Sequence, residues 1–135
     1  MMVEQRGRVL LEAGVSPSED PDKVVAAVRN VVGGAHGCQE EIGRKVKVTC
    51  GDVKSMVHLR DHLRDRHVRS VARKRLLAGK QGDRTTLMLN RQAASAGVLV
   101  VCGSPEESTL GPIFLTIEST ELDRVIDWLT AYELG

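Results

Sequence analysis

The sequence predicts an α+β fold, with helices packed on one face of a mainly antiparallel sheet in the order β-α-β-α-β-β-β-α. Two observations carry this prediction. Residues 53–77 contain no Gly and no Pro and lie between Gly51 and Gly79, so we expect one long central helix. Three β-like runs with polar connections follow it, which suggests an antiparallel meander. With 135 residues, of which 41% are apolar, the chain fits a single domain over residues 1–135.

The first part of the chain alternates strand and helix. Residues 8–15 form a β-like run, and the turn residues at 16–21 end it. Asp20 suits a helix N-cap, Pro21 the first helical position and Gly33 the end. After a predicted loop over 34–43, residues 45–50 alternate charged and apolar side chains, as an exposed or edge strand does. The helix has one apolar face, which we expect to cover the sheet: Val24, Val25, Val28, Val31 and Val32.

The last part of the chain predicts strands and a closing helix. Residues 84–89 predict a strand, residues 90–97 a polar turn or short helix, and residues 98–102 and 113–117 two further strands. Thr120, with Asp123 three residues later, has the spacing of a capping box, so we expect the final helix to begin there. Four apolar residues define its packing side: Leu122, Val125, Ile126 and Leu129.

The predicted long helix is strongly basic. Residues 53–80 hold nine Lys or Arg against two Asp, a formal +7, so the rest of the chain must sum to −6 to give the overall +1. On a helical wheel at ~100° per residue, one broad side is apolar and holds Val53, Met56, Val57, Leu63, Val68 and Val71. The opposite side carries a stripe without an acid: Ser55, His58, His62, Arg66, Arg69 and Arg73.

This basic stripe, extended by Lys74, predicts a ridge that contacts phosphates. Arginines at about one-turn intervals can follow a polyanion and release its counterions. The alternative interpretation is a solvated face with no ligand, which is what most charge runs are.

Arg60 and Arg64 fall on the apolar side of the same helix, four residues apart. A buried guanidinium needs acids, backbone carbonyls or a second subunit, because leaving it unpaired costs several kcal/mol. We therefore predict that both line the edge of a homodimer interface or a paired polar seam against the sheet, and that they are not the primary RNA contacts.

The numbers of aromatic residues and cysteines limit the classes of function that the sequence predicts. Phe114, Trp128 and Tyr132 are the whole aromatic set, too few for a protein that reads RNA by stacking on unpaired bases. The three cysteines are odd in number and form no CxxC pair, which predicts buried free thiols and argues against a disulfide framework or a zinc site. No membrane span and no secretory leader is recognisable, so we expect a cytoplasmic protein.

Residues that could hold a metal or perform catalysis do not form a recognisable set. His58 and His62 have the spacing of two ligands on a helix, but no third ligand accompanies them. The loop that holds His36, Cys38 and the glutamates at 40 and 41 completes no metal spacing. No nucleophile with a base, carboxylate pair or phosphate-cradling loop is recognisable, so we expect no cofactor and no enzymatic activity.

Several stretches together resemble a known family. They are TTLMLNRQAA at 85–94, LGPI at 110–113, IDWL at 126–129, the Leu-Arg pairs at 59–60 and 63–64, and SEDP at 18–21. In these the chain resembles a small archaeal family of uncharacterised proteins described as predicted RNA-binding, and the resemblance covers nearly the whole length. It implies a fold similar to double-stranded-RNA-binding domains and to a ribosomal protein that binds 5S RNA. The histidines of the long helix do not map onto this pattern.

The tripeptide Asn90-Arg91-Gln92 lies between two apolar strands and allows two interpretations. In an exposed turn, Arg91 and its amide neighbours would contact a phosphate or a ribose hydroxyl. Alternatively, Asn90 and Gln92 satisfy backbone groups of the turn itself.

Two functions from different classes follow from the sequence. The first is a non-catalytic module that binds structured or double-stranded RNA by shape and backbone charge, through the basic helix with help from Arg91. The second is a homo-oligomeric scaffold or adaptor without a nucleic-acid ligand, whose basic helix docks an acidic protein surface. In a second copy of the chain, the residues outside 53–80, with a formal charge of −6, would supply such a surface.

Overall fold

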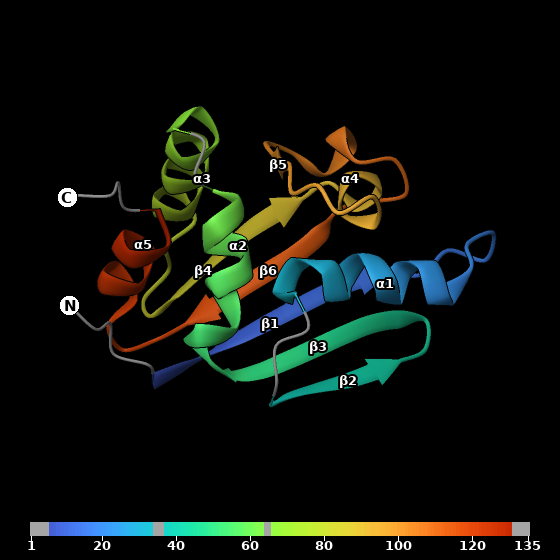
Figure 1. The fold of residues 1–135 in the computed structure, drawn as a ribbon, viewed down its shortest axis with the longest axis horizontal. Coiled ribbons are helices and arrows are strands. Elements are labelled where there is room, and N and C mark those ends of the chain that lie inside the picture. Colours follow the sequence, from blue (N-terminus) through green and yellow to red (C-terminus); the bar gives the residue numbers. More distant parts are fainter. Residues whose placement is uncertain (1–5, 34–36, 64–65, 131–135) are drawn as a thin grey trace.

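A computed structural model describes residues 6–33, 37–63 and 66–130 of the chain. Its six strands form one antiparallel sheet in the order β2-β3-β1-β6-β4-β5 (Figure 1). The strands are β1 (Arg6–Gly14), β2 (Cys38–Ile42), β3 (Lys45–Asp52), β4 (Arg84–Leu89), β5 (Val101–Cys102) and β6 (Ile113–Glu118). The helices are α1 (Pro21–Val32), α2 (Val57–His62), α3 (Arg66–Ala78), α4 (Arg91–Ser95) and α5 (Leu122–Thr130), with short 3-10 helices η1 (Val53–Met56) and η2 (Pro105–Glu107). This confirms the predicted α+β class.

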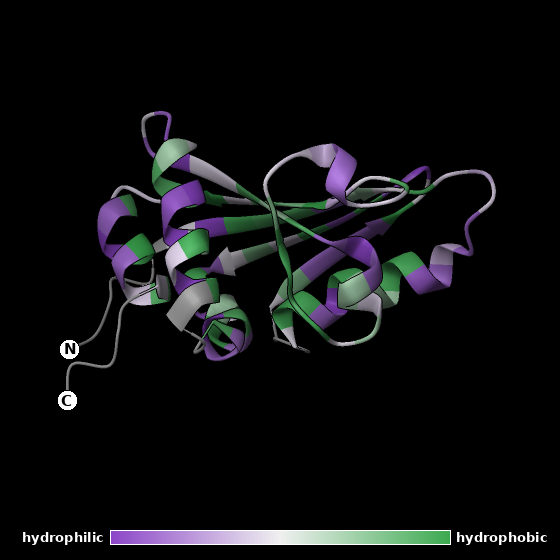
Figure 2. Cartoon of the chain, turned by 90° about the horizontal axis from the view of Figure 1, so that it is seen from above, coloured by the Kyte–Doolittle hydropathy of each residue, from purple (hydrophilic) through white to green (hydrophobic). Residues whose placement is uncertain are grey.

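The core lies between one face of the sheet and the helices. Strand residues alternate between buried and solvent-facing positions, and hydrophobic and hydrophilic segments alternate accordingly along the strands and around the helices in Figure 2. On the opposite face of the sheet, Leu10 and Met88 are half-buried and Phe114 is exposed. The inner face contributes fully buried side chains such as Val9, Leu11, Val46, Val48, Leu87, Leu115 and Ile117.

Helix α1 forms as the sequence predicts. The Asp20 side chain accepts a hydrogen bond from the Asp22 amide at 3.0 Å, Pro21 is the first helical residue, and Gly33 ends the helix in the left-handed region at φ 60°. All five valines of its apolar face are buried. Across the described ranges, no helix has the length and apolar character needed to cross a membrane.

The late strands do not form the predicted meander. β4 pairs with β5 on one side and with β6 on the other, and β6 also pairs with β1. β6 is therefore inserted between the first strand and β4, which makes β5 an edge strand. Only Val101 and Cys102 of the predicted strand over 98–102 pair in the sheet, while Val98 and Val100 are exposed. The Val98 amide instead donates to the Ala93 carbonyl and the Val100 carbonyl accepts from the Asn90 amide, both at 2.8 Å, so this part of the apolar run is bonded to the α4 turn.

The predicted single long helix is wrong, because the segment folds as η1, α2 and α3. Asp52 caps its start by accepting from the Lys54 amide at 2.8 Å, and α2 ends at His62 with Leu63 as its C-cap, at φ −89° and ψ 21°. Leu59 in α2 and Ala72 in α3 are both fully buried. On one continuous helix these positions would lie roughly 140° apart at ~100° per residue. Breaking the helix lets both face the core, whereas Val57 on the predicted apolar side is 45% exposed.

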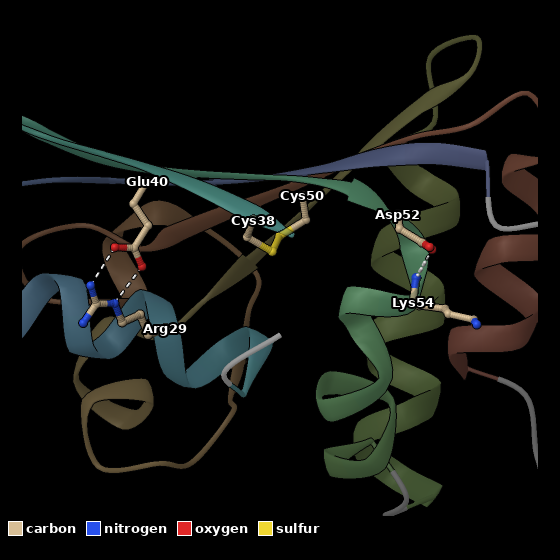
Figure 3. Close-up of a disulfide and its surroundings, with 6 residues drawn as sticks. All are labelled: Arg29, Cys38, Glu40, Cys50, Asp52 and Lys54. Atoms are coloured by element: carbon tan, nitrogen blue, oxygen red, sulfur yellow. Dashed lines mark hydrogen bonds and ion pairs between the residues drawn. A yellow bond between two sulfur atoms is a disulfide. The ribbon is translucent and has the colours of Figure 1, made fainter. Parts of the chain in front are cut away.

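Residues 38–42 form β2, an edge strand where the sequence predicts a loop. It pairs antiparallel with β3, and Cys38 lies opposite Cys50 with a Cα–Cα distance of 4.2 Å. The two sulfurs form a disulfide (Figure 3), so the prediction of free thiols is wrong for this pair and holds for buried Cys102. Arg29 of α1 adds a bidentate ion pair to Glu40 of β2, with both N–O distances 2.6 Å. These contacts fix an otherwise exposed strand to its neighbours.

Candidate functional site

Helix α3 carries the predicted basic surface. Its thirteen residues include five Lys or Arg and no acid. Ala72 and Leu76 are fully buried and set the inward face, so Lys74 is exposed and Arg69 is half-buried. Lys74 forms no ion pair with any residue that the structure describes. Arg66 begins the helix, but its side chain lies outside the described part.

Helix α5 brings acids against this basic surface. Arg73 Nη1 donates to Asp127 Oδ1 at 2.8 Å and to Thr130 Oγ1 at 3.2 Å, and Lys80 pairs with Asp123. The Arg73 and Asp127 side chains are 43% and 63% exposed. Because an exposed pair contributes only about 0–1 kcal/mol, this contact holds Arg73 in place without preventing exchange for another anion.

Arg60 lies in a polar seam, but the seam is between α2 and α5 and not against the sheet. Its Nε donates to the Trp128 carbonyl at 2.8 Å, and its guanidinium carbon lies 5.4 Å from the centre of the Trp128 ring. A backbone carbonyl and an aromatic face thus satisfy this arginine within one chain. Arg64 falls outside the described residues. The predicted homodimer contact of the two arginines stays a prediction.

Asn90 and Gln92 have different surroundings. Asn90 is the N-cap of α4, where its side-chain oxygen accepts from the Ala93 amide at 2.9 Å. Its amide nitrogen donates to the Glu107 carbonyl at 3.3 Å. Asn90 therefore satisfies backbone groups, as the second interpretation of this turn predicts, while Gln92 is exposed beside it.

Arg91 is buried, so its predicted contact with RNA is wrong for this fold. Its side chain is 5% exposed, and its Nη1 donates to both oxygens of Glu19, at 2.7 and 2.8 Å. The Glu19 side chain is 11% exposed. A guanidinium that is buried and already paired with an acid is not placed to reach the phosphate backbone of an RNA at the surface.

A hydrogen-bond network extends from this buried pair. Arg91 Nε donates to the Gly111 carbonyl at 3.1 Å, and the Arg91 amide donates to Ser108 Oγ at 3.1 Å. Ser108 Oγ itself donates to the Gly111 carbonyl at 2.9 Å. Burial raises the pKa of the Glu19 carboxyl, but the hydrogen bond from the Ser16 amide and the contact with Arg91 outweigh it and hold that pKa below its usual value. The network therefore joins three distant segments around a charged centre.

An open hollow of about 800 Å³ lies at the other end of the sheet. Arg8 and Arg84 line it, and both donate to Glu118, with nitrogen–oxygen distances of 2.6 and 3.1 Å. The hydrogen bond from Arg8 holds the pKa of Glu118 below its usual value, against a smaller opposing effect of burial. Both arginine side chains are 61% exposed, so this is a solvated cluster that largely neutralises itself.

His58 and His62 contact each other on α2. Their ring centroids are 4.3 Å apart, and His62 Nδ1 lies 3.0 Å from the His58 carbonyl oxygen. Burial and the neighbouring His62 lower the pKa of His58. Within the described residues no three His, Cys, Asp or Glu side chains come together as a metal would require. Cys38 and Glu40, weighed as ligands, are committed to the disulfide and to Arg29.

Sequence reasoning missed the partners of Arg91. Glu19 lies 72 positions away, in a stretch whose residues predict only a turn, and Ser108 lies in a connection for which the sequence predicts no contact. The available signal was weak: Arg91 and Glu19 both lie in stretches that carry the family resemblance. Nothing in either stretch alone indicates that they meet.

Comparisons with known proteins give close relatives without an assigned activity. No family model matches the chain. It is 39% identical over 125 residues to a UPF0201 protein of Sulfolobus acidocaldarius, covering 91% of this chain and 86% of the relative. It is 40% identical over 128 residues to the UPF0201 protein of Aeropyrum pernix, covering 92% and 85%.

Solved structures agree with these sequence relatives. A UPF0201 protein from Methanococcus jannaschii matches with a TM-score of 0.73 and 26% identity, over 95% of this chain and 96% of that one. The structure of another UPF0201 protein matches with a TM-score of 0.76 and 25% identity, over 95% and 97%. The archaeal resemblance found in the sequence is thereby confirmed, whereas the likeness to RNA-binding domains stays a prediction. This chain belongs to the UPF0201 family.

Proposed function

We propose that this protein binds structured or double-stranded RNA through backbone phosphates, using a basic surface on α3 formed by Arg69, Arg73 and Lys74. The observation that carries the proposal is the composition of α3, which has five cations and no acid and whose exposed Lys74 lies opposite the buried Ala72 and Leu76. A polyanion gains affinity from such a surface by releasing counterions, without needing specific base contacts. Arg91 is not among these contacts, because it is buried against Glu19.

The positions of the aromatic residues support recognition of backbone and shape. Trp128 packs under Arg60, and Phe114 lies on the sheet face away from the helices. Tyr132 lies outside the described residues. Two separated rings do not form the continuous platform on which unpaired bases stack, so a duplex suits this surface better than a single strand.

Binding to a short RNA duplex across a salt series tests the proposal. We expect affinity to fall linearly with salt on logarithmic axes, and we expect the triple variant Arg69→Gln, Arg73→Gln, Lys74→Gln to reduce the slope by about 2–3. The matched control removes three exposed cations elsewhere, with Lys23→Gln, Arg44→Gln and Lys45→Gln. The proposal fails if the wild type does not bind at low salt, or if both triple variants lose the same slope.

A second candidate function is a homo-oligomeric scaffold, which the helix-free face of the sheet favours. Leu10 lies at the centre of this face on β1, with Arg8 two residues before it and Glu12 two residues after. A twofold axis through Leu10 would bring Arg8 of each copy opposite Glu12 of the other, as an isologous interface requires. We therefore propose that a second copy of this chain binds the sheet face. In the adaptor form of the hypothesis, an acidic protein binds α3 instead.

Sedimentation separates this second function from the first. If the sheet face is an interface, Phe114→Glu should shift the protein toward monomer, because it places a charge beside the apolar centre, while duplex binding at α3 stays intact. A monomeric wild type rules out the scaffold. Retrieval of partners from lysate with and without nuclease addresses the adaptor form, since a protein partner survives nuclease treatment.

A further inference from the structure

A cavity of about 350 Å³ lies beside the buried Arg91–Glu19 pair. It is lined by the start of α1, by α4 and by Leu110 of the loop before β6. The three lining segments are far apart in the sequence, and the Arg91 network holds them together. Its volume is at the lower end of the range for small-molecule sites, about 300–1,000 Å³.

Hydrogen-bond donors remain available in this cavity, and the carboxylate buried beside them, Glu19, is already engaged. Glu19 accepts from Arg91 and from the Ser16 amide, and Asp20 accepts from the Asp22 amide as the cap of α1. Arg91 uses Nε and Nη1, and its Nη2 makes no hydrogen bond to a described residue. This nitrogen is therefore a charged donor on a side chain that is 95% buried, since 5% is exposed.

Two exposed side chains add donors at the cavity. Lys23 lines it and forms no ion pair within the described part of the chain, and the Gln92 amide lies across from α1 on α4. Together with Arg91 Nη2, these groups are suited to bind negatively charged oxygen atoms. The cavity thus offers donors from three side chains to an oxyanion.

Leu110 contributes an apolar wall to the cavity, and its backbone has an unusual conformation. Leu110 has φ 71°, a left-handed value that costs a non-glycine residue on the order of 1–3 kcal/mol, yet the residue is 50% exposed. The hydrogen bonds of Arg91 and Ser108 to the Gly111 carbonyl fix this turn. Val24 and Ala27 of α1 complete the apolar lining.

We propose that this cavity binds a small molecule that carries a carboxylate or phosphate group next to a short apolar group. The oxyanion accepts from Arg91 Nη2 and Lys23, and the apolar part lies against Val24 and Leu110. The site is separate from the basic surface of α3, and it does not depend on RNA binding.

Calorimetric titration with three probes of similar size tests the chemistry: butyrate, butyl phosphate and neutral butyramide. We expect one or both anions to bind at millimolar concentration and at least about tenfold more tightly than butyramide, because charge-assisted hydrogen bonds are roughly twice as strong as neutral ones. The two anions also show whether a carboxylate or a phosphate fits better. Binding of neither anion, or equal binding of butyramide, overturns the proposal.

Exposed residues provide variants that leave the fold intact. Gln92→Glu places an acid in the lining and should abolish anion binding, whereas Gln39→Glu on β2 adds the same charge far away and should not. Lys23→Gln should weaken binding by about threefold to tenfold, with exposed Lys54→Gln as its control. If each variant and its control bind alike, the anions occupy another place and the assignment of this cavity is wrong.

Discussion

The arginine at position 91 and the arginine at position 73 have opposite environments, although both lie in polar, helix-forming segments. The Arg91 side chain is 5% exposed and shares a desolvated pair with Glu19, while Arg73 is 43% exposed and pairs with an acid that faces solvent. The same chemical group is therefore held mainly by the fold in one region and is exposed to a polyanion at the surface in the other. Burial of the partner acid, and not the charge of the arginine, makes this difference.

Removing one member of the buried pair should have the largest effect. We expect Arg91→Ala to lower the free energy of unfolding by about 3–5 kcal/mol, because Glu19 is left charged and buried. Urea denaturation measures this. Replacing both residues, with Arg91→Met and Glu19→Leu, should cost clearly less than the single change, and a double variant as unstable as Arg91→Ala would show that the pair is not the cause.

Acid should weaken the same pair without a mutation. The pKa of Glu19 is lower in the folded protein than the usual 4.5, so the unfolded chain binds its proton first as the pH falls. The stabilisation is complete above the unfolded pKa and is lost as the pH falls through the folded pKa. Melting temperatures between pH 7 and pH 3 should fall less steeply for Glu19→Gln than for the wild type, and parallel curves would contradict the assignment.

Opening the disulfide should destabilise the protein while leaving both arginine regions intact. Cys38 and Cys50 are separated by 12 positions, and closing a loop of that size contributes about 3 kcal/mol in the chain-entropy model. A dithiol reductant should lower the urea midpoint of the wild type and leave that of the double variant Cys38→Ala, Cys50→Ala unchanged. RNA affinity of the reduced, still folded protein should stay the same, which distinguishes lost stability from lost binding.

Arg60 should give an intermediate effect, since it is half-buried and, among the described residues, its guanidinium has its hydrogen bond and its ring contact with Trp128. Losing its hydrogen bond to the carbonyl and its stacking on the ring should cost about 1–2 kcal/mol in Arg60→Ala. Arg60→Lys keeps the charge but not the planar donor group, so it should recover only part of this loss. Full recovery by lysine would mean that charge alone matters at this position.

The smallest effect on stability is expected for Arg73→Gln, below about 1 kcal/mol, because its pair with Asp127 is exposed. If α3 binds RNA, the same variant should reduce the salt slope of duplex binding by about 1. Asp127→Asn, which removes the competing acid, should strengthen binding. A large loss of stability in Arg73→Gln would show that Arg73, like Arg91, stabilises the fold, and would contradict the difference drawn between them.

Caps and side-chain periodicity, which depend on residues close together in the sequence, predict several of the helices and strands correctly. Asp20, Pro21 and Gly33 delimit α1 because caps act through neighbouring backbone groups, and β4 spans the predicted residues 84–89 because its side chains alternate. The final helix was placed correctly as well, although its preceding turn is held by Ser119, whose hydroxyl accepts from the Glu121 amide at 3.0 Å, and not by Thr120.

Caps and periodicity do not predict contacts between residues that are far apart in the sequence. β2 is almost wholly exposed and becomes a strand only because β3 supplies hydrogen-bond partners and Cys50 lies opposite Cys38. The break between α2 and α3 depends on where the sheet lies relative to Leu59 and Ala72, which a helical wheel of the isolated segment does not contain.

The sequence by itself determined the α+β class, the caps of α1 and the concentration of positive charge on residues 53–80. These depend on backbone preference, side-chain periodicity and charge, which are properties of neighbouring residues. Only the tertiary structure decided that Arg91 is buried against Glu19, that Cys38 meets Cys50 and that Arg73 faces Asp127. Each of these contacts joins residues that the fold alone brings together, and the free energy of a charge or a thiol depends on what surrounds it.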